Sequence, residues 1–240
     1  MVDKKIEVFY RDVQYESDYM HKEKIRPFWF NYNIIKDNFT KTINRHLSGL
    51  TIVNDVKRMP IDYIGLTSMM LEEGESEYQI RQGSDQGAFL ELMKILEEIG
   101  FKSDQIIYIV ENDYLHRPGW CEILLEGFEH GDYVTLYDHP DKYTDYTDLQ
   151  SKIFVTKSCH WRTIPSTTNT FAVKYGILME DMELHKYYAE FGIQGLAHDH
   201  TKFLDLGKKG RKIISSIPGY STHCNNYLSP CTDWQKIIKK

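Results

Sequence analysis

Two carboxylates stand where a buried strand is predicted to end. Ile106–Val110 are five consecutive apolar residues, and Glu111, Asn112 and Asp113 follow them. Such a run with polar residues at its end is typical of a strand buried on both faces. Ligands of open α/β sheets collect at the carboxyl ends of strands, where carboxylates suit a divalent cation held by a phosphorylated substrate. The alternative is an ordinary polar loop before a helix that starts at Pro118.

Three further polar residues lie near the ends of other predicted elements. Arg11 follows a predicted strand at Ile6–Tyr10, and we expect it to contact a diphosphate unless it is simply a solvated strand end. Asp55 follows a strand at Leu50–Val53, where it can accept hydrogen bonds from a base or ribose. Arg81 precedes a helix and is placed to contact a nucleotide or its phosphates. Together with the acids, this set would hold a nucleotide diphosphate through one Mg²⁺ or Mn²⁺, since both ions prefer oxygen ligands.

The predicted strands alternate with helices through the first half of the chain. Apolar residues four apart predict a helix within Pro27–Leu47, and a second apolar face predicts a helix that ends at Gly100. This alternation is typical of a parallel sheet. Two later strands, Lys152–Thr156 and Thr170–Val173, are separated only by a polar turn, which indicates antiparallel strands. We therefore predict a single α/β domain with a mixed sheet, mostly parallel in its N-terminal half and antiparallel in its C-terminal half, with helices on both faces.

Composition limits the classes of partner. Of the 240 residues, 41% are hydrophobic and 27% are charged, which is typical of a globular domain. A formal charge of −6 argues against nucleic-acid binding through phosphate neutralisation. The sequence has no run of about 18 apolar residues, so we predict no membrane span. The four cysteines lack Cys-x-x-Cys spacing, which favours a reducing compartment, and we expect a soluble cytoplasmic protein. The oligomeric state is not predicted.

Together these features resemble the glycosyltransferases of the GT-A fold, in which a strand-terminal Asp-x-Asp motif or a variant binds the metal of a nucleotide-sugar donor. The order of elements agrees over most of the chain. The sequence is also similar to the small glycosyltransferase domains of large algal DNA viruses, the chloroviruses, and a viral origin implies the host cytoplasm. It departs from the family motif by having glutamate at position 111. The resemblance thus implies that Asp113 binds the metal directly, while Glu111 acts through water or the ribose.

The resemblance also implies roles in the second half of the chain. A late histidine completes the metal shell in many members, and His223 is the matching residue, although a histidine in such a loop is otherwise an ordinary surface residue. An inverting transfer needs a base for the acceptor hydroxyl. Asp199, at a predicted helix start, is the first candidate unless it only caps that helix, and Asp181 is the second. Residues 1–117 are then the nucleotide-sugar half, and residues 118–240 the acceptor half.

The predicted function is metal-dependent transfer of a sugar from a UDP-sugar to a hydroxyl of a glycan, with inversion and Asp199 as the base. Retention of configuration stays open if neither candidate base lies opposite the metal. One alternative is a nucleotidyltransferase that makes sugar-nucleotides, but the glycine-rich loop expected after its first strand is missing after Arg11. Another is a non-catalytic sugar-binding or protein-binding module, which the joint presence of Asp113, Asp199 and His223 disfavours.

Overall fold

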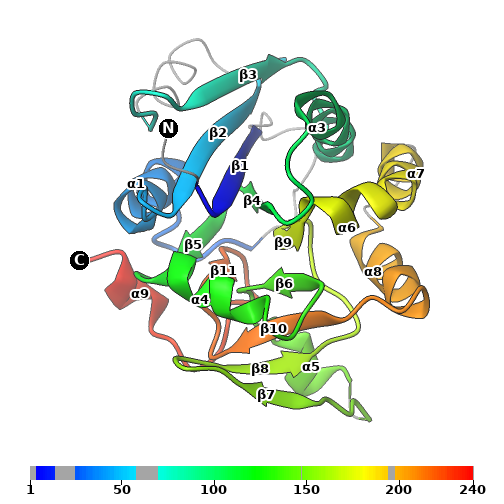
Figure 1. The fold of residues 1–240 in the computed structure, drawn as a ribbon. Helices are drawn as coiled ribbons and strands as arrows, with labels where there is room; N and C mark the ends of the chain where they lie inside the picture. The colour runs from blue at the N-terminus through cyan, green and yellow to red at the C-terminus, as the bar shows by residue number, and fades with distance from the viewer. Residues whose placement is uncertain (1–3, 14–24, 58–69, 147, 194–197, 240) are drawn as a thin grey trace.

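A computed structural model describes residues 4–13, 25–57, 70–146, 148–193 and 198–239 (Figure 1). Its strands are β1 (Ile6–Val13), β2 (Ser48–Asp55), β3 (Ser76–Ile80), β4 (Ile106–Glu111), β5 (Tyr114–His116), β6 (Tyr133–Thr135), β7 (Ile153–Val155), β8 (His160–Thr163), β9 (Phe171–Lys174), β10 (Ile213–Ile217) and β11 (Ser221–His223). Its helices are α1 (Tyr32–Thr42), α3 (Asp85–Ile99), α4 (Trp120–Gly127), α5 (Asp141–Thr144), α6 (Tyr175–Glu180), α7 (Met182–Ile193), α8 (Asp199–Lys208) and α9 (Trp234–Ile237).

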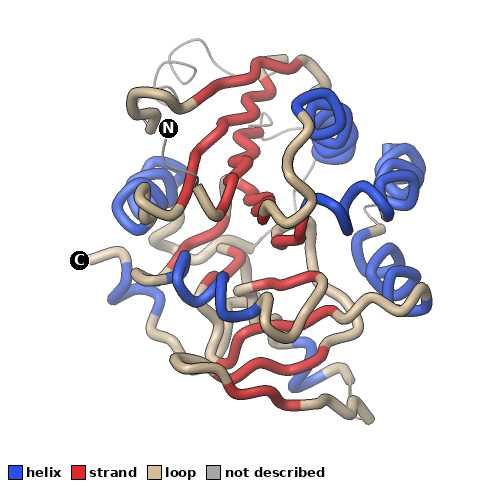
Figure 2. Tube along the Cα trace, viewed as in Figure 1, coloured by secondary structure: helices blue, strands red, loops and turns tan. Residues whose placement is uncertain are grey.

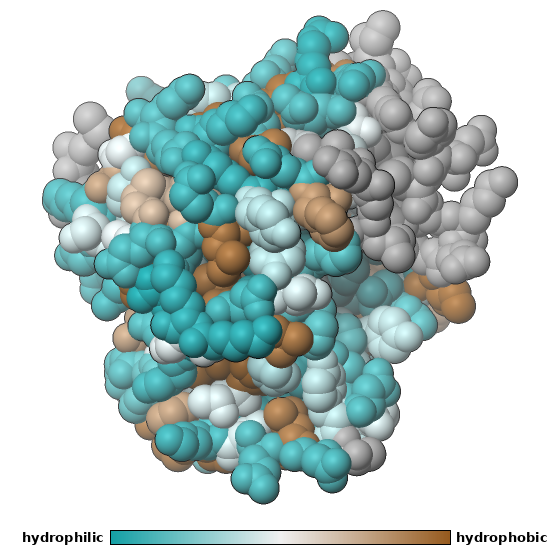
Figure 3. Space-filling view, turned by 90° about the vertical axis from the view of Figure 1, so that its right-hand side faces the viewer, coloured by the Kyte–Doolittle hydropathy of each residue, from teal (hydrophilic) through white to brown (hydrophobic). Residues whose placement is uncertain are grey.

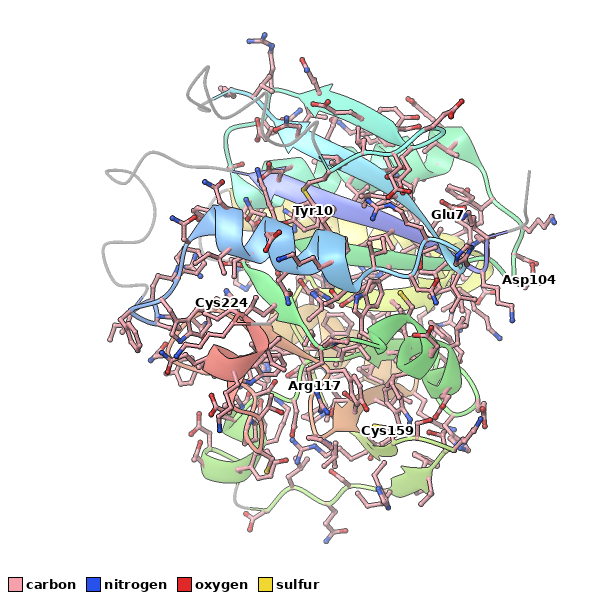
Figure 4. The ribbon with its side chains drawn as sticks, turned by 90° about the vertical axis from the view of Figure 1, so that its left-hand side faces the viewer. Glu7, Tyr10, Asp104, Arg117, Cys159 and Cys224 are labelled. Carbon is pink, nitrogen blue, oxygen red and sulfur yellow. The ribbon has the colours of Figure 1, made fainter. Side chains whose placement is uncertain are left out.

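The main sheet changes from parallel to antiparallel along its width, as predicted. Its strand order is β3-β2-β1-β4-β9-β6-β10-β8-β7, and β11 pairs with β5 separately. Strands β1 to β4 are parallel, whereas β9 lies antiparallel between β4 and β6. The carboxyl ends of β1, β2, β4 and β6 therefore share one edge with the amino end of β9. Figure 4 shows this polarity: Tyr10 and Cys224 lie toward one side of the molecule, and Glu7 and Asp104 toward the other.

Helices cover both faces of the sheet, again as predicted (Figures 1 and 2). Successive strand residues point to opposite faces, so Tyr10 of β1 packs in the core with Phe39 of α1, while Phe9 packs with Phe89 and Leu92 of α3. Helix α4 lies on the α1 side, and α6, α7 and α8 lie on the α3 side. The outer face of this second group is largely hydrophilic, with hydrophobic residues in small separate patches (Figure 3).

Some predicted element boundaries were wrong. Helix α1 is shorter than the predicted Pro27–Leu47: the Asn31 side chain accepts from the Asn33 amide to start it, and extended backbone at Ile43 ends it. The polar turn predicted before Thr170–Val173 contains strand β8. That strand pairs with β7 and β10, so β7 and β9 do not pair with each other.

The segment between β2 and α3, for which no firm prediction was made from the sequence, is described in part. Strand β3 forms one edge of the main sheet within a segment for which no prediction was made. The apolar stretch at positions 63–66 lies outside the described residues. No helix in the described part of the chain has the length and hydrophobicity needed to cross a bilayer.

Gly127 at the end of α4 gives a test of this packing. An alanine Cβ there would lie 2.6 Å from Val134 Cγ1 and 2.8 Å from Trp161 Cη2, both in the core. We expect Gly127→Ala to lower the free energy of unfolding by about 1–3 kcal/mol through overpacking. Gly207→Ala in α8 is the matched control, since its Cβ meets nothing within 4 Å and alanine favours a helix. Urea denaturation checks both variants, and equal stability of the two would contradict the described packing.

Candidate active site

The guanidinium of Arg11 lies at the centre of the shared sheet edge. It is 1% exposed, and its Nη2 donates to the Asp85 backbone oxygen at 2.7 Å and to Asp85 Oδ1 at 2.8 Å. Its Nη1 lies 3.5 Å from Glu111 Oε1. A buried cation needs such compensation, and here it joins the end of β1 to the start of α3 and the end of β4. The predicted diphosphate contact of Arg11 stays a prediction.

Glu111 is held by the neighbouring strand. Its backbone N–H donates to Thr170 Oγ1 at 3.2 Å, and that hydroxyl donates to Glu111 Oε2 at 3.0 Å. Burial raises the pKa of Glu111 to about 8, and the Asp85 carboxylate adds to this shift while Arg11 opposes it. The raised pKa favours the protonated form of Glu111 more than in an exposed glutamate, and its contacts with Thr170 and Arg11 suit a hydrogen-bonding role.

The pairing of β5 with β11 brings Asp113 and His223 together. His223 stands opposite Tyr114 in this ladder and stacks on its ring, with centroids 4.9 Å apart. Its Nε2 lies 3.0 Å from Asp113 Oδ2, and its Nδ1 lies 3.0 Å from Asn225 Nδ2, so the ring orientation is fixed from both sides. The structure thus places side by side the two residues predicted to bind metal.

The chemistry of this donor pair fits a divalent ion carried by a substrate. One carboxylate oxygen and one imidazole nitrogen suit Mn²⁺ or Mg²⁺, but Arg26 Nη1 also contacts Asp113 Oδ2, at 2.9 Å. Within the described ranges, no group of three or more His, Cys, Asp or Glu side chains is placed to hold an ion. An ion at Asp113 and His223 would replace the Arg26 contact and take its other ligands from phosphate oxygens and water.

Asp199 starts α8, as predicted, and belongs to a chain of polar side chains. Asn169 Nδ2 donates to Asp199 Oδ1 at 2.7 Å, and Lys202 Nζ donates to Asn169 Oδ1. Burial raises the pKa of Asp199; Lys202 opposes this shift and Asp85 adds to it. Lys202 is 2% exposed and lies over the ring of Phe89 at 4.4 Å. Burial lowers its pKa to about 8, against the effect of Asp199. The result is a rigidly held carboxylate that accepts a proton more readily than an exposed one.

Asp55 and Arg81 lie near the same edge in different environments. Asp55 is 1% exposed and accepts from the amides of Gln82 at 3.1 Å and Gly83 at 2.6 Å. It therefore fastens the end of β2 to the turn before α3. Arg81 is exposed in that turn. The predicted contacts of both residues with the nucleotide stay predictions.

Asp181 lies in a separate network. It is fully buried at the start of α7 and accepts from Arg211 Nε at 2.7 Å, from Tyr133 Oη at 2.9 Å and from Lys209. Burial alone would raise its pKa, but the hydrogen bonds from Arg211, Lys209 and Tyr133 outweigh burial and lower it. Such a carboxylate is a weak base, so the geometry favours a structural role for Asp181 and leaves Asp199 as the better candidate.

A second buried cluster went unnoticed in the sequence. Asp12 is fully buried, its Oδ2 lies 2.7 Å from Lys36 Nζ of α1, and its Oδ1 accepts from Asn112 Nδ2 at 2.7 Å. The backbone N–H of Asn112 also donates to the Arg11 backbone carbonyl at 3.1 Å. These bonds shape the turn between Glu111 and Asp113. The only sequence signal was the polar pair after the first strand.

Comparison with known proteins identifies the fold. No protein-family model and no curated protein matches the sequence. A crystal structure from Desulfovibrio desulfuricans G20, of a proposed nucleotide-diphospho-sugar transferase, aligns over 88% of this chain and 79% of its own, with 10% identity and a TM-score of 0.52. A CMP:2-keto-3-deoxy-manno-octonic acid synthetase complexed with CTP aligns over 98% of both chains, with 13% identity and a TM-score of 0.51.

These likenesses show that the chain has a GT-A-like nucleotide-diphospho-sugar transferase fold in a single domain. At such low identity they bear on the fold alone. The narrower similarity to chlorovirus glycosyltransferase domains is not supported by these structures and stays a prediction.

The buried Lys202 predicts an unusual pH dependence of stability. Its pKa of about 8 in the folded state lies below the value of about 10.4 for an exposed lysine, so the unfolded chain binds more protons between these limits and stability rises with pH there. Lys202→Met removes this contribution. We therefore compare the melting temperatures of the wild type and Lys202→Met at pH 7 and at pH 9.5. The wild-type value minus the variant value should be larger at pH 9.5 by roughly a few degrees.

Lys208→Met is the control for this measurement, because Lys208 lies on the same helix with its side chain 76% exposed. Its melting temperature should follow that of the wild type across the pH range. Parallel curves for the wild type and Lys202→Met would show that Lys202 is not buried as a cation.

Proposed function

We propose that the protein is a metal-dependent glycosyltransferase that moves a sugar from a nucleotide-sugar, with UDP as the nucleotide, to a hydroxyl of a glycan. The observation that carries this proposal is the meeting of Asp113 and His223 3.0 Å apart on the edge that also holds Glu111 and Arg11. Asp199 belongs to the same cluster, since its charge affects the pKa of Glu111. The fold supports a substrate containing a nucleotide diphosphate at this edge.

Asp113 and His223 are the residues that would hold Mn²⁺ or Mg²⁺ with the donor. When bound, such an ion neutralises the charge that develops on the leaving diphosphate. Glu111, which Thr170 and Arg11 hold in place, would take part beside the ion through hydrogen bonds. We assign Arg26 to the diphosphate as well, because its guanidinium already lies against Asp113 at 2.9 Å.

Asp199 is the proposed base. It takes the proton of the acceptor hydroxyl as that oxygen forms a bond to the anomeric carbon, and the bond from this carbon to the diphosphate oxygen breaks with its electron pair. Attack from the face opposite the diphosphate inverts the configuration. Asn169, which donates to Asp199 Oδ1 at 2.7 Å, fixes the direction of the carboxylate. The raised pKa of Asp199 supports its role as a proton acceptor.

Substitution of the two acids separates donor binding from chemistry. Asp113→Asn should abolish the Mn²⁺-dependent thermal stabilisation of the protein by UDP-sugars. Asp199→Asn should keep that stabilisation and lose transfer by about 10²- to 10⁴-fold, the usual contribution of a general base. Thermal shift with a panel of nucleotide-sugars, with and without Mn²⁺, and transfer to a panel of oligosaccharides measure the two effects.

Asp205→Asn serves as the control, because Asp205 lies on α8 and pairs with Lys208 away from the helix start. No stabilisation by any nucleotide-sugar would refute the donor site. Full activity of Asp199→Asn would refute the base, leaving the donor site intact.

A second candidate function comes from the alignment with a CTP-bound synthetase. A nucleotidyltransferase would release pyrophosphate from a nucleoside triphosphate in the presence of a sugar or a sugar phosphate. The absence of glycine between Arg11 and Gly49 argues against the phosphate-binding loop that such enzymes use after the first strand. A pyrophosphate-release assay with the four nucleoside triphosphates distinguishes the two functions.

A further inference from the structure

Two loops lie side by side next to the proposed metal ligands. The first follows β6 and contains α5, and the second follows β11. The Asp138 amide donates to Ser229 Oγ at 3.2 Å, and Tyr137 Oη donates to the Tyr227 carbonyl at 2.6 Å, which joins the loops. Tyr137 also contacts the ring of His223, with centroids 6.3 Å apart. The paired loops are therefore continuous with the donor site.

Each loop has a half-exposed tyrosine, and one face of its ring packs against another side chain. The Tyr143 ring lies on the Arg162 guanidinium at 4.5 Å, and its hydroxyl donates to Asp138 Oδ2 at 2.7 Å, yet the residue is 54% exposed. Tyr227 stacks on His139, with centroids 5.4 Å apart, and is 47% exposed. An ordinary surface tyrosine is free to rotate, whereas a ring fixed in advance loses little entropy when a ligand covers it.

The cations beside these rings are already paired with acids. Arg162 pairs with Asp138, and Lys142 pairs with Asp141, whose Oδ1 also lies 2.9 Å from His139 Nδ1. Arg162 and Lys142 are both nearly buried. Arg162 and Lys142 are thus already paired with acids of this surface. A phosphate-rich or sulfated ligand would need unpaired cations, so the described part of this surface does not suit one.

The same surface leads to the proposed base. The Tyr146 ring lies 5.0 Å from Lys142 Nζ, and its hydroxyl lies 3.2 Å from Nδ1 of His200, the residue after Asp199. The loop with α5 thus extends from Tyr143 to Tyr146, which contacts the start of α8.

We propose that Tyr143 and Tyr227 form the acceptor site and bind an uncharged pyranose of a glycan by stacking on its apolar C–H face. The sugar next to it extends along α5 and presents its hydroxyl to Asp199. The part of this inference that directs a hydroxyl to Asp199 rests on the proposed function. Aromatic rings with a fixed orientation, beside cations that are already paired, are suited to recognise a neutral sugar ring.

Ligand-observed NMR tests the site without donor or turnover. The probes are the neutral disaccharides cellobiose, maltose, lactose and N,N′-diacetylchitobiose, with a sulfated disaccharide for comparison. At least one neutral probe should bind, and Tyr227→Ala and Tyr143→Ala should each raise its Kd about five- to tenfold, as expected for the loss of one aromatic contact. Tyr143→Phe keeps the ring on Arg162 and loses only the bond to Asp138, so it should raise the Kd less than Tyr143→Ala does.

Tyr78→Ala is the matched control, because Tyr78 is a 38% exposed tyrosine on the edge strand β3. The Tyr227 side chain is the safer one to remove, since the hydrogen bonds with Tyr137 and Asn225 use its backbone: its carbonyl accepts from Tyr137 and its N–H donates to Asn225 Oδ1. Absence of binding by every neutral probe, tighter binding of the sulfated one, or unchanged Kd values in both alanine variants would each overturn the acceptor site. UDP binding, measured in parallel, reports on the donor site separately.

Discussion

The site depends on the burial of opposite charges at the end of β1. Successive residues of a strand face opposite sides of the sheet, so Arg11 points to α3, where it meets Asp85, and Asp12 points to α1, where it meets Lys36. All of these charges except Asp85 are almost completely buried. Removing one partner would leave the other charged in a region of low polarity, which is strongly destabilising. Both helical layers and the Glu111–Asp113 turn are fixed relative to one another by these two residues.

Four carboxylates lie at or near the end of a strand or the start of a helix, but their chemical environments differ. Asp113 faces an imidazole and a guanidinium, Glu111 has its pKa raised by burial, Asp199 is held by an amide, and Asp181 is neutralised by Arg211 and Lys209. Acid and base roles in enzymes are set by environments that move pKa values apart. The differences arise from partners distant in the sequence, so they belong to the fold and not to the local motifs.

This distance explains how much was predictable from the sequence. The long apolar runs predicted β1, β2 and β4, and the polar residues after them located the edge of the sheet. Strand β8 was missed because Trp161 is its one large apolar residue among polar neighbours. Asp199 and Asp181 both lie at helix starts, and their environments differ through partners distant in the sequence, such as Arg211, thirty residues from Asp181, and Asn169, thirty residues from Asp199. Arg26 and Lys202 gave no local signal, because Asp113 meets Arg26 and Asn169 meets Lys202 only through tertiary packing.

The position of β9 between β4 and β6 has a consequence for how the protein is made. Thr170, which bonds Glu111, directly precedes β9, and until residues 171–174 have left the ribosome the edge of β4 has no neighbour on that side. Residues 1–117 therefore cannot complete their own site during synthesis. This edge of the sheet is assembled from both halves at a late stage, so a chain interrupted in its middle has an open strand edge and an unfinished site.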